Sequence, residues 1–155
     1  MAQVADDQLF YAPDAESNSI AIVVKHMAGN MRSRWTDFLT TDGEKPWRDR
    51  DSEFEDPPRD RPELMQMWEE GWACLFQALR SLDDSHLTAR VLIRGEAHSV
   101  LQAINRQLCH YAYHIGQIVL LAKQWRQRDW TPLSVPRGKS ADFHQRVLRG
   151  ETSQR

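Results

Sequence analysis

The sequence contains little cysteine, no long apolar run and no large net charge, and each absence excludes a class of protein. Its two cysteines, Cys74 and Cys109, form neither a disulfide framework nor a C-x-x-C pair, which favours a reducing cytoplasm over export. The formal net charge of −2 provides no basic field for nucleic acid or an anionic membrane. The N-terminus lacks the features of a signal peptide, and no apolar run approaches the ~18 residues of a membrane span. We therefore expect one soluble, cytoplasmic domain over residues 1–155, with no nucleic-acid or membrane partner.

Three segments repeat apolar residues at the three- and four-residue spacing of an amphipathic helix. They are residues 19–39, 62–82 and 100–126. Pro62 suits the first turn of the second segment, and Ser99 can cap the third. A shorter helix is expected around residues 141–148, and residues 87–99 alternate weakly, as in a short strand pair or an extended connection. This pattern predicts an all-α fold.

Residues 40–61 interrupt the helical pattern with proline, glycine and many charges. A connection of this length in a compact domain is unusual and is often functional. Its arginines alternate with carboxylates, so attraction to nucleic-acid phosphates largely cancels and ion pairs within the protein are the better interpretation. We expect an ordered loop that these ion pairs tie to the helices, with Trp47 and Phe54 as apolar anchors.

The segment "CHYAYHIGQIVLL", residues 109–121, places two histidines four residues apart in an apolar run. At ~100° per residue, His110 and His114 lie about 40° apart on one face of a helix. His26 belongs to a similar polar stripe beside the apolar face of the segment 19–39. If the two helices pack side by side, the three imidazoles converge and form a divalent-metal site with an open fourth position.

A second interpretation of the histidines stays open at this point. His110 and His114 by themselves are also typical of two hydrogen-bonded core histidines or of a half-exposed helix face.

A three-histidine site accepts zinc, nickel, iron or copper, and zinc and nickel are the first candidates. The remaining histidines fall in connections or in the tail and are expected at the surface. They are His86, His98 and His144.

Polar side chains near the histidine stripes are candidates for binding a substrate. They are Asn30, Arg34, Arg106, Gln107, Tyr113 and Gln117. No general base is evident, because H-E-x-x-H carries a glutamate between its ligands whereas "HYAYH" carries tyrosine and alanine. Ser-His-Asp catalysis and a glycine-rich phosphate loop have no supporting motif. The catalytic residues are therefore unassigned.

Two long segments of the chain resemble the DinB-like (YfiT-like) superfamily, in a branch of uncharacterised bacterial proteins. They are "SNSIAIVVKHMAGNMRSRWTDFLTTDGEKPWRDRDSEFE", residues 17–55, and "IRGEAHSVLQAINRQLCHYAYHIGQIVLLAK", residues 93–123. The resemblance implies an up-down-down-up four-helix bundle that is usually dimeric. It also implies a metal held by one histidine of the second helix and two of the fourth, which match His26, His110 and His114. Characterised enzymes of that superfamily are thiol S-transferases and a thiol-dependent isomerase.

The chain departs from that superfamily at its start, where only "MAQVADDQLF" precedes the matching segment. This stretch is too short for the first helix of the bundle, so we expect a truncated helix there and a homodimer that covers the exposed apolar surface. The resulting hypothesis is a divalent-metal-dependent transferase or hydrolase that acts on a low-molecular-weight thiol or another small molecule. The alternative is a non-catalytic, dimeric metal-binding or stress-response protein.

Overall fold

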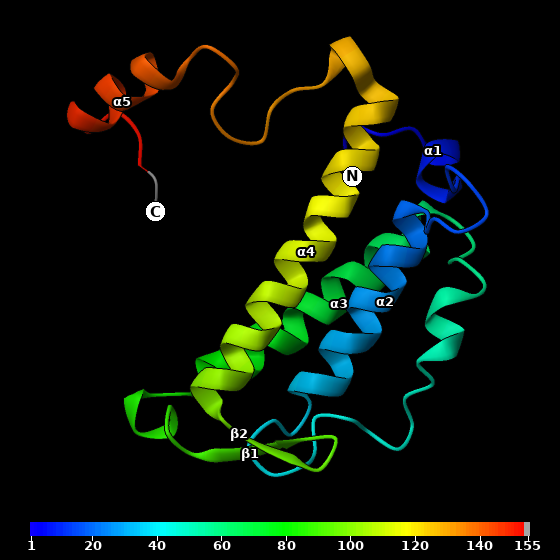
Figure 1. Cartoon of the computed structure of the whole chain (residues 1–155), viewed down its shortest axis with the longest axis vertical. Helices are drawn as coiled ribbons and strands as arrows, with labels where there is room; N and C mark the ends of the chain where they lie inside the picture. The colour runs from blue at the N-terminus through cyan, green and yellow to red at the C-terminus, as the bar shows by residue number, and fades with distance from the viewer. Residues whose placement is uncertain (154–155) are drawn as a thin grey trace.

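The computed structural model describes residues 1–153 and confirms a mostly helical fold with a short strand pair (Figure 1). The helices are α1 (Asp6–Phe10), α2 (Ile20–Trp35), α3 (Arg61–Arg80), α4 (Val100–Arg126) and α5 (Ser140–Leu148). The strands are β1 (Arg90–Ile93) and β2 (Glu96–Ser99), and short 3-10 turns lie at η1 (Asp51–Phe54), η2 (Asp84–His86) and η3 (Gln127–Asp129). The element before α2 is thus a helix of only five residues.

Side-chain caps fix where the long helices begin. The Ser19 hydroxyl accepts a hydrogen bond from the Ile22 amide at the start of α2. The Ser99 hydroxyl accepts from the Gln102 amide, and the Gln102 side chain accepts from the Ser99 amide, which completes a capping box. The expectation that the first helix reaches residue 39 was wrong, because α2 ends at Trp35 and Asp37 follows with a left-handed φ of 48°.

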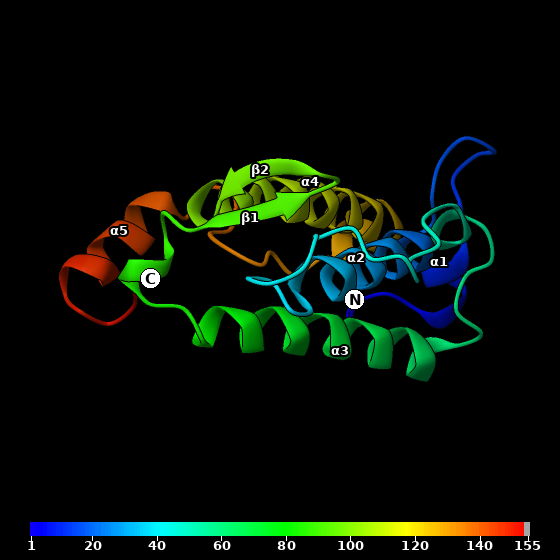
Figure 2. The ribbon, with the colours of Figure 1, turned by 90° about the horizontal axis from the view of Figure 1, so that it is seen from below.

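Helix α2 lies between α3 and α4, which pack mainly against α2 rather than against each other (Figure 2). Helices α2 and α3 run in the same direction and α4 runs back (Figure 1). Close packing of α2 on α3 depends on Gly71, since a Cβ there would lie 3.1 Å from the Ala28 Cα and 2.9 Å from the Met31 Cε. None of the helices within residues 1–153 is long and apolar enough to cross a membrane.

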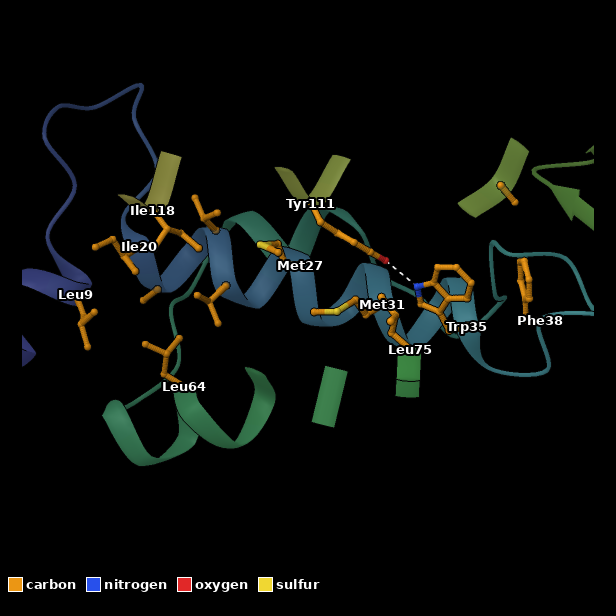
Figure 3. Close-up of a cluster of buried hydrophobic side chains, with 14 of the residues drawn as sticks. Leu9, Ile20, Met27, Met31, Trp35, Phe38, Leu64, Leu75, Tyr111 and Ile118 are labelled. Carbon is orange, nitrogen blue, oxygen red and sulfur yellow. Dashed lines mark hydrogen bonds between the residues drawn. The ribbon is translucent and has the colours of Figure 1, made fainter. Parts of the chain in front are cut away.

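The core follows the length of α2 (Figure 3). Ile20, Met27 and Met31 of α2 are fully buried, and Leu64 of α3 packs in the same cluster. The Trp35 indole N–H donates a hydrogen bond of 2.8 Å to the Tyr111 hydroxyl and so joins the end of α2 to the middle of α4. This join holds the histidine-bearing faces of α2 and α4 against each other.

The connection from residue 36 to residue 60 is ordered by polar contacts with the strand pair and with α2. Arg94 and Gly95 form the two-residue turn between the strands with φ values of 56° and 76°. Their amides donate to the Asp42 carboxylate at 2.8 and 2.7 Å. The Lys25 ammonium donates to the backbone carbonyl of Ser52 at 2.5 Å. The expected ion pairs of the loop are present, since Arg48 pairs with Glu44 and Glu53, and the Lys25 contact positions η1 beside α2.

The expectation that Trp47 anchors this loop was wrong. Its side chain is 56% exposed and lies beside the Arg32 guanidinium, 5.7 Å from the ring centroid. Phe54 is 39% exposed but stacks on His26, with ring centroids 4.5 Å apart. The buried anchors of the loop are Lys45 and Glu53 instead: the Lys45 amide donates to the Ser33 hydroxyl of α2, and the Glu53 carboxylate lies against His26.

Candidate metal centre

Three histidine Nε2 atoms converge between α2 and α4. His26 is buried on α2, and His110 and His114 are partly buried on successive turns of α4. The His110 Nε2 lies 3.3 Å from the His26 Nε2 and 3.1 Å from the His114 Nε2. Two zinc–nitrogen bonds of ~2.0–2.1 Å at a tetrahedral angle place their nitrogens about 3.3 Å apart. The His110 Nε2 thus has this spacing to both neighbours, and the ligand atoms of all three histidines lie within 4.8 Å of one another, which is compatible with a divalent metal ion.

The opposite ring nitrogens of two histidines are held by hydrogen-bond acceptors. The His26 Nδ1 lies 2.9 Å from the Glu53 Oε2, and the His114 Nδ1 lies 2.8 Å from the Gln117 Oε1. When each Nδ1 carries the proton and donates it, each Nε2 presents its lone pair to the centre of the cluster. Lone pairs at this separation repel one another unless a cation or a proton lies between them. The donor set is thus compatible with a bound metal ion.

Glu53 is the residue of this centre that sequence reasoning missed. It is 5% exposed, and its carboxylate accepts from the Arg48 Nε at 2.8 Å and from the Arg48 Nη2 at 2.9 Å, besides His26. It lies directly over Gly29, where any Cβ would overlap its carboxylate. The missing side chain at Gly29, one turn from His26, is the one sequence signal that could have indicated a close approach here.

Burial favours the neutral form of the two α4 histidines at ordinary pH. Burial, together with the neighbouring His114 and His26, lowers the pKa of His110 to about 4. Burial and His26 also lower the pKa of His114 below its ordinary value, against the opposing hydrogen bond to Gln117. Burial alone would raise the pKa of Glu53, but the hydrogen bonds from His26 and Arg48 lower it. His110 and His114 are therefore available as neutral ligands, and Glu53 is ionised.

We expect the metal-free protein to lose stability as the pH falls from 6.5 to about 4. In that window the unfolded chain protonates His110 and the folded chain does not, so the free energy of unfolding decreases. The loss from this ring should be about 1–2 kcal/mol after discounting for its partial exposure, or a Tm lower by roughly 2–8 °C. Thermal unfolding from pH 7.5 to 4.5 measures it, and an equal slope in His110→Gln would contradict the assignment.

Replacing Glu53 with glutamine should weaken zinc binding by ~10–100-fold, the usual effect of losing the carboxylate behind a histidine ligand. The amide keeps the shape of the side chain but removes the charge that orients and polarises His26. Competition with a chromophoric chelator measures the affinity. Glu55→Gln, an exposed residue two positions along the chain, is the matched control. Equal affinity in the two variants would exclude the role of Glu53.

The structure divides the six expected substrate-binding residues into two groups. Asn30, Arg34, Arg106 and Gln107 line a pocket of about 100 Å³ whose wall includes His26 and His110. The other two lie beside His114 instead. The Gln117 side chain contacts the His114 Nδ1, and the Tyr113 ring is 64% exposed and packs on His114 with centroids 5.0 Å apart.

The remaining histidines lie away from the centre. His86 contacts Asp83 in η2, His98 lies on β2 and His144 is exposed on α5. Within residues 1–153, the triad is the one group of three histidine, cysteine or acidic residues with ligand atoms close enough to share a metal ion.

The fold and this centre define a mostly helical protein with a candidate three-histidine metal site. The model of the family described as "Protein of unknown function (DUF1572)" matches residues 1–139, and the chain belongs to this family. No curated protein and no solved structure shows significant similarity to the chain. The family description names no activity.

Proposed function

We propose that the chain is a divalent-metal-dependent enzyme whose ion is held by His26, His110 and His114. The observation that carries this proposal is the convergence of three Nε2 atoms at 3.1 and 3.3 Å steps, with Glu53 and Gln117 behind two of the rings. Three protein ligands leave a fourth position for a small molecule. Zinc and nickel are the first candidates, with iron and copper as alternatives, because imidazole suits all four.

The resemblance to the DinB-like superfamily supports a thiol S-transferase or a hydrolase within this proposal. A metal held there would lower the pKa of a bound thiol or water molecule. The chain's own residues fix the rings: Glu53 holds His26, Gln117 holds His114, and Phe54 covers one face of the His26 ring. The substrate would enter through the pocket beside His26 and His110, lined by Asn30, Arg34, Arg106 and Gln107.

A second function is favoured by one observation, the engagement of Glu53. Its carboxylate is occupied by His26 and by both nitrogens of the Arg48 fork, so it is not free to move a proton to or from a substrate. A centre without a free base suits a non-catalytic metal-binding or stress-response protein. Under both functions we place the protein in the cytoplasm, where its two cysteines would stay reduced.

We also propose a homodimer, supported by an apolar groove between α3 and α4. This α3–α4 groove has a volume of about 260 Å³, and Trp72 and Leu79 of α3 face Ile104, Leu108 and Ile115 of α4 across it. Leu108 is 64% exposed and Ile115 is 37% exposed. Exposed apolar surface of this kind is typical of an interaction site.

Elemental analysis of protein purified without a nickel column tests the function. We expect about one equivalent of zinc or nickel per chain, followed by metal-dependent transfer in a screen of low-molecular-weight thiols and electrophiles. Stoichiometric metal without any turnover would favour the non-catalytic alternative. A protein that binds none of the four metals, even after dialysis against each of them at micromolar concentration, would overturn the metal centre itself.

A further inference from the structure

Five arginines surround the pocket that adjoins the histidine triad. They are Arg34, Arg48, Arg50, Arg94 and Arg106. They come from α2, from the long connection, from the strand turn and from α4, so that four separate parts of the chain bring positive charge to one place. His26 and His110 form the wall between this arginine pocket and the candidate metal position.

Carboxylates of the chain neutralise only part of this charge. The Glu53 carboxylate is held by Arg48, and the Glu44 carboxylate is shared by Arg94 at 3.3 Å, Arg48 at 3.4 Å and Arg34 at 3.9 Å. Asp42 accepts the amides of the strand turn near the same place. Five guanidinium groups thus face three carboxylates, and the pocket keeps an excess of positive charge.

Two of the arginines have no carboxylate partner among residues 1–153. Arg50 and Arg106 are exposed at the pocket and take part in none of the ion pairs of the chain. An exposed arginine is ordinarily solvated and needs no explanation. Two unpaired arginines lining a pocket that already holds three others form a field that attracts an anion.

The Arg34 side chain indicates a ligand independently of the net charge of the pocket. Its side chain is 3% exposed, yet its Nε and Nη1 have no hydrogen-bond partner within the described chain. The nearest carboxylate, that of Glu44, is 3.9 Å away, which is too far for a hydrogen bond. A buried charged group with unpaired donors is costly. A planar guanidinium fork in a pocket is suited to binding two oxygens of one oxyanion.

We propose that the arginine pocket binds an oxyanion group, a carboxylate or a phosphate, of the small molecule on which the centre acts. This inference rests on the proposed function for the identity of the reacting centre, but the anion site is made by the arginines alone. A volume of about 100 Å³ is that of roughly three water molecules at ~30 Å³ each, enough for one such group. The substrate class is therefore a small anionic compound whose reacting atom reaches the metal while its charged end stays on Arg34 and Arg106.

Calorimetric titration of the metal-free protein with inorganic phosphate and, separately, with acetate tests the site. We expect one anion to bind per chain without metal, and the tighter of the two probes identifies the oxyanion. Arg106→Gln should weaken that binding by ~10–100-fold, the usual effect of losing one charge-assisted hydrogen bond. Arg80→Gln, an exposed arginine of α3 outside the pocket, is the matched control and should bind as the parent does.

Arg34→Gln should abolish binding, with the helical circular dichroism spectrum showing whether this buried variant still folds. If it does not fold, Arg50→Gln and Arg106→Gln combined provide the same test on exposed positions. Binding that requires zinc and is unchanged in Arg106→Gln would overturn the proposal, because the anion would then be only a metal ligand. Absence of binding with and without zinc would also overturn it. Anion binding by a protein that takes up no metal would leave the arginine pocket standing and exclude the metal function.

Discussion

Alanine variants of His26, His110 and His114 should each lose stoichiometric zinc while keeping most of their helicity. Each ring supplies one of the three converging Nε2 atoms. Removal of a ligand leaves two imidazoles, so the loss in affinity should exceed the ~10–100-fold change expected when a partner behind a ligand is removed. Plasma mass spectrometry of the dialysed proteins measures the metal content, and circular dichroism measures the helicity.

The three variants are not equal as tests. His26 is 2% exposed and packs against Phe54, so its alanine variant also leaves a cavity and should be less stable. His114 is partly buried near the surface of α4, and its variant separates metal loss from misfolding most cleanly. His144→Ala on α5 is the control. One equivalent of zinc in all three triad variants would exclude the triad.

Light scattering should find a homodimer across micromolar concentrations, and Leu108→Glu should convert it to a monomer. Burying a leucine side chain contributes ~1.5–3 kcal/mol. A twofold interface contains the substituted residue twice, so the change should weaken the dimer by more than about 100-fold. Leu133→Glu is the control, since Leu133 is 70% exposed and lies outside the α3–α4 groove.

A monomer with a sharp unfolding transition would contradict this expectation. It would mean that α2, with α3 and α4 packed on it, is stable although the groove stays open to water. A dimer that persists in Leu108→Glu would instead place the interface on another surface. The two outcomes are distinguished by running parent and variant at the same concentrations.

The helices and the triad could be predicted from the sequence because both depend on local rules. Ser99 caps α4 and the apolar spacing carries that helix to Arg126, as expected. A spacing of four residues places His110 and His114 on one face whatever the rest of the chain does. His26 needed only the further assumption that the two apolar faces pack together.

The contribution of the loop could not be predicted, because no periodicity constrains an irregular connection. Trp47 is apolar and is expected inside, but its ring lies beside the Arg32 guanidinium of α2 and stays at the surface. Glu53 is one acidic residue among many in that segment. Only the fold shows that its carboxylate reaches His26 and Arg48.

The arrangement of Glu53 over Gly29 has a consequence for motion. The carboxylate belongs to the long connection and the imidazole it holds belongs to α2, so opening of the connection would be thermodynamically coupled to release of a metal ion bound at the triad. An ion that binds the triad more tightly when Glu53 is in place must also stabilise the closed connection relative to the open one. By reciprocity, the two effects are equal in size. A bound metal ion would then stabilise the closed connection. The segment that carries arginines to the pocket would therefore open least often when the triad holds a metal ion.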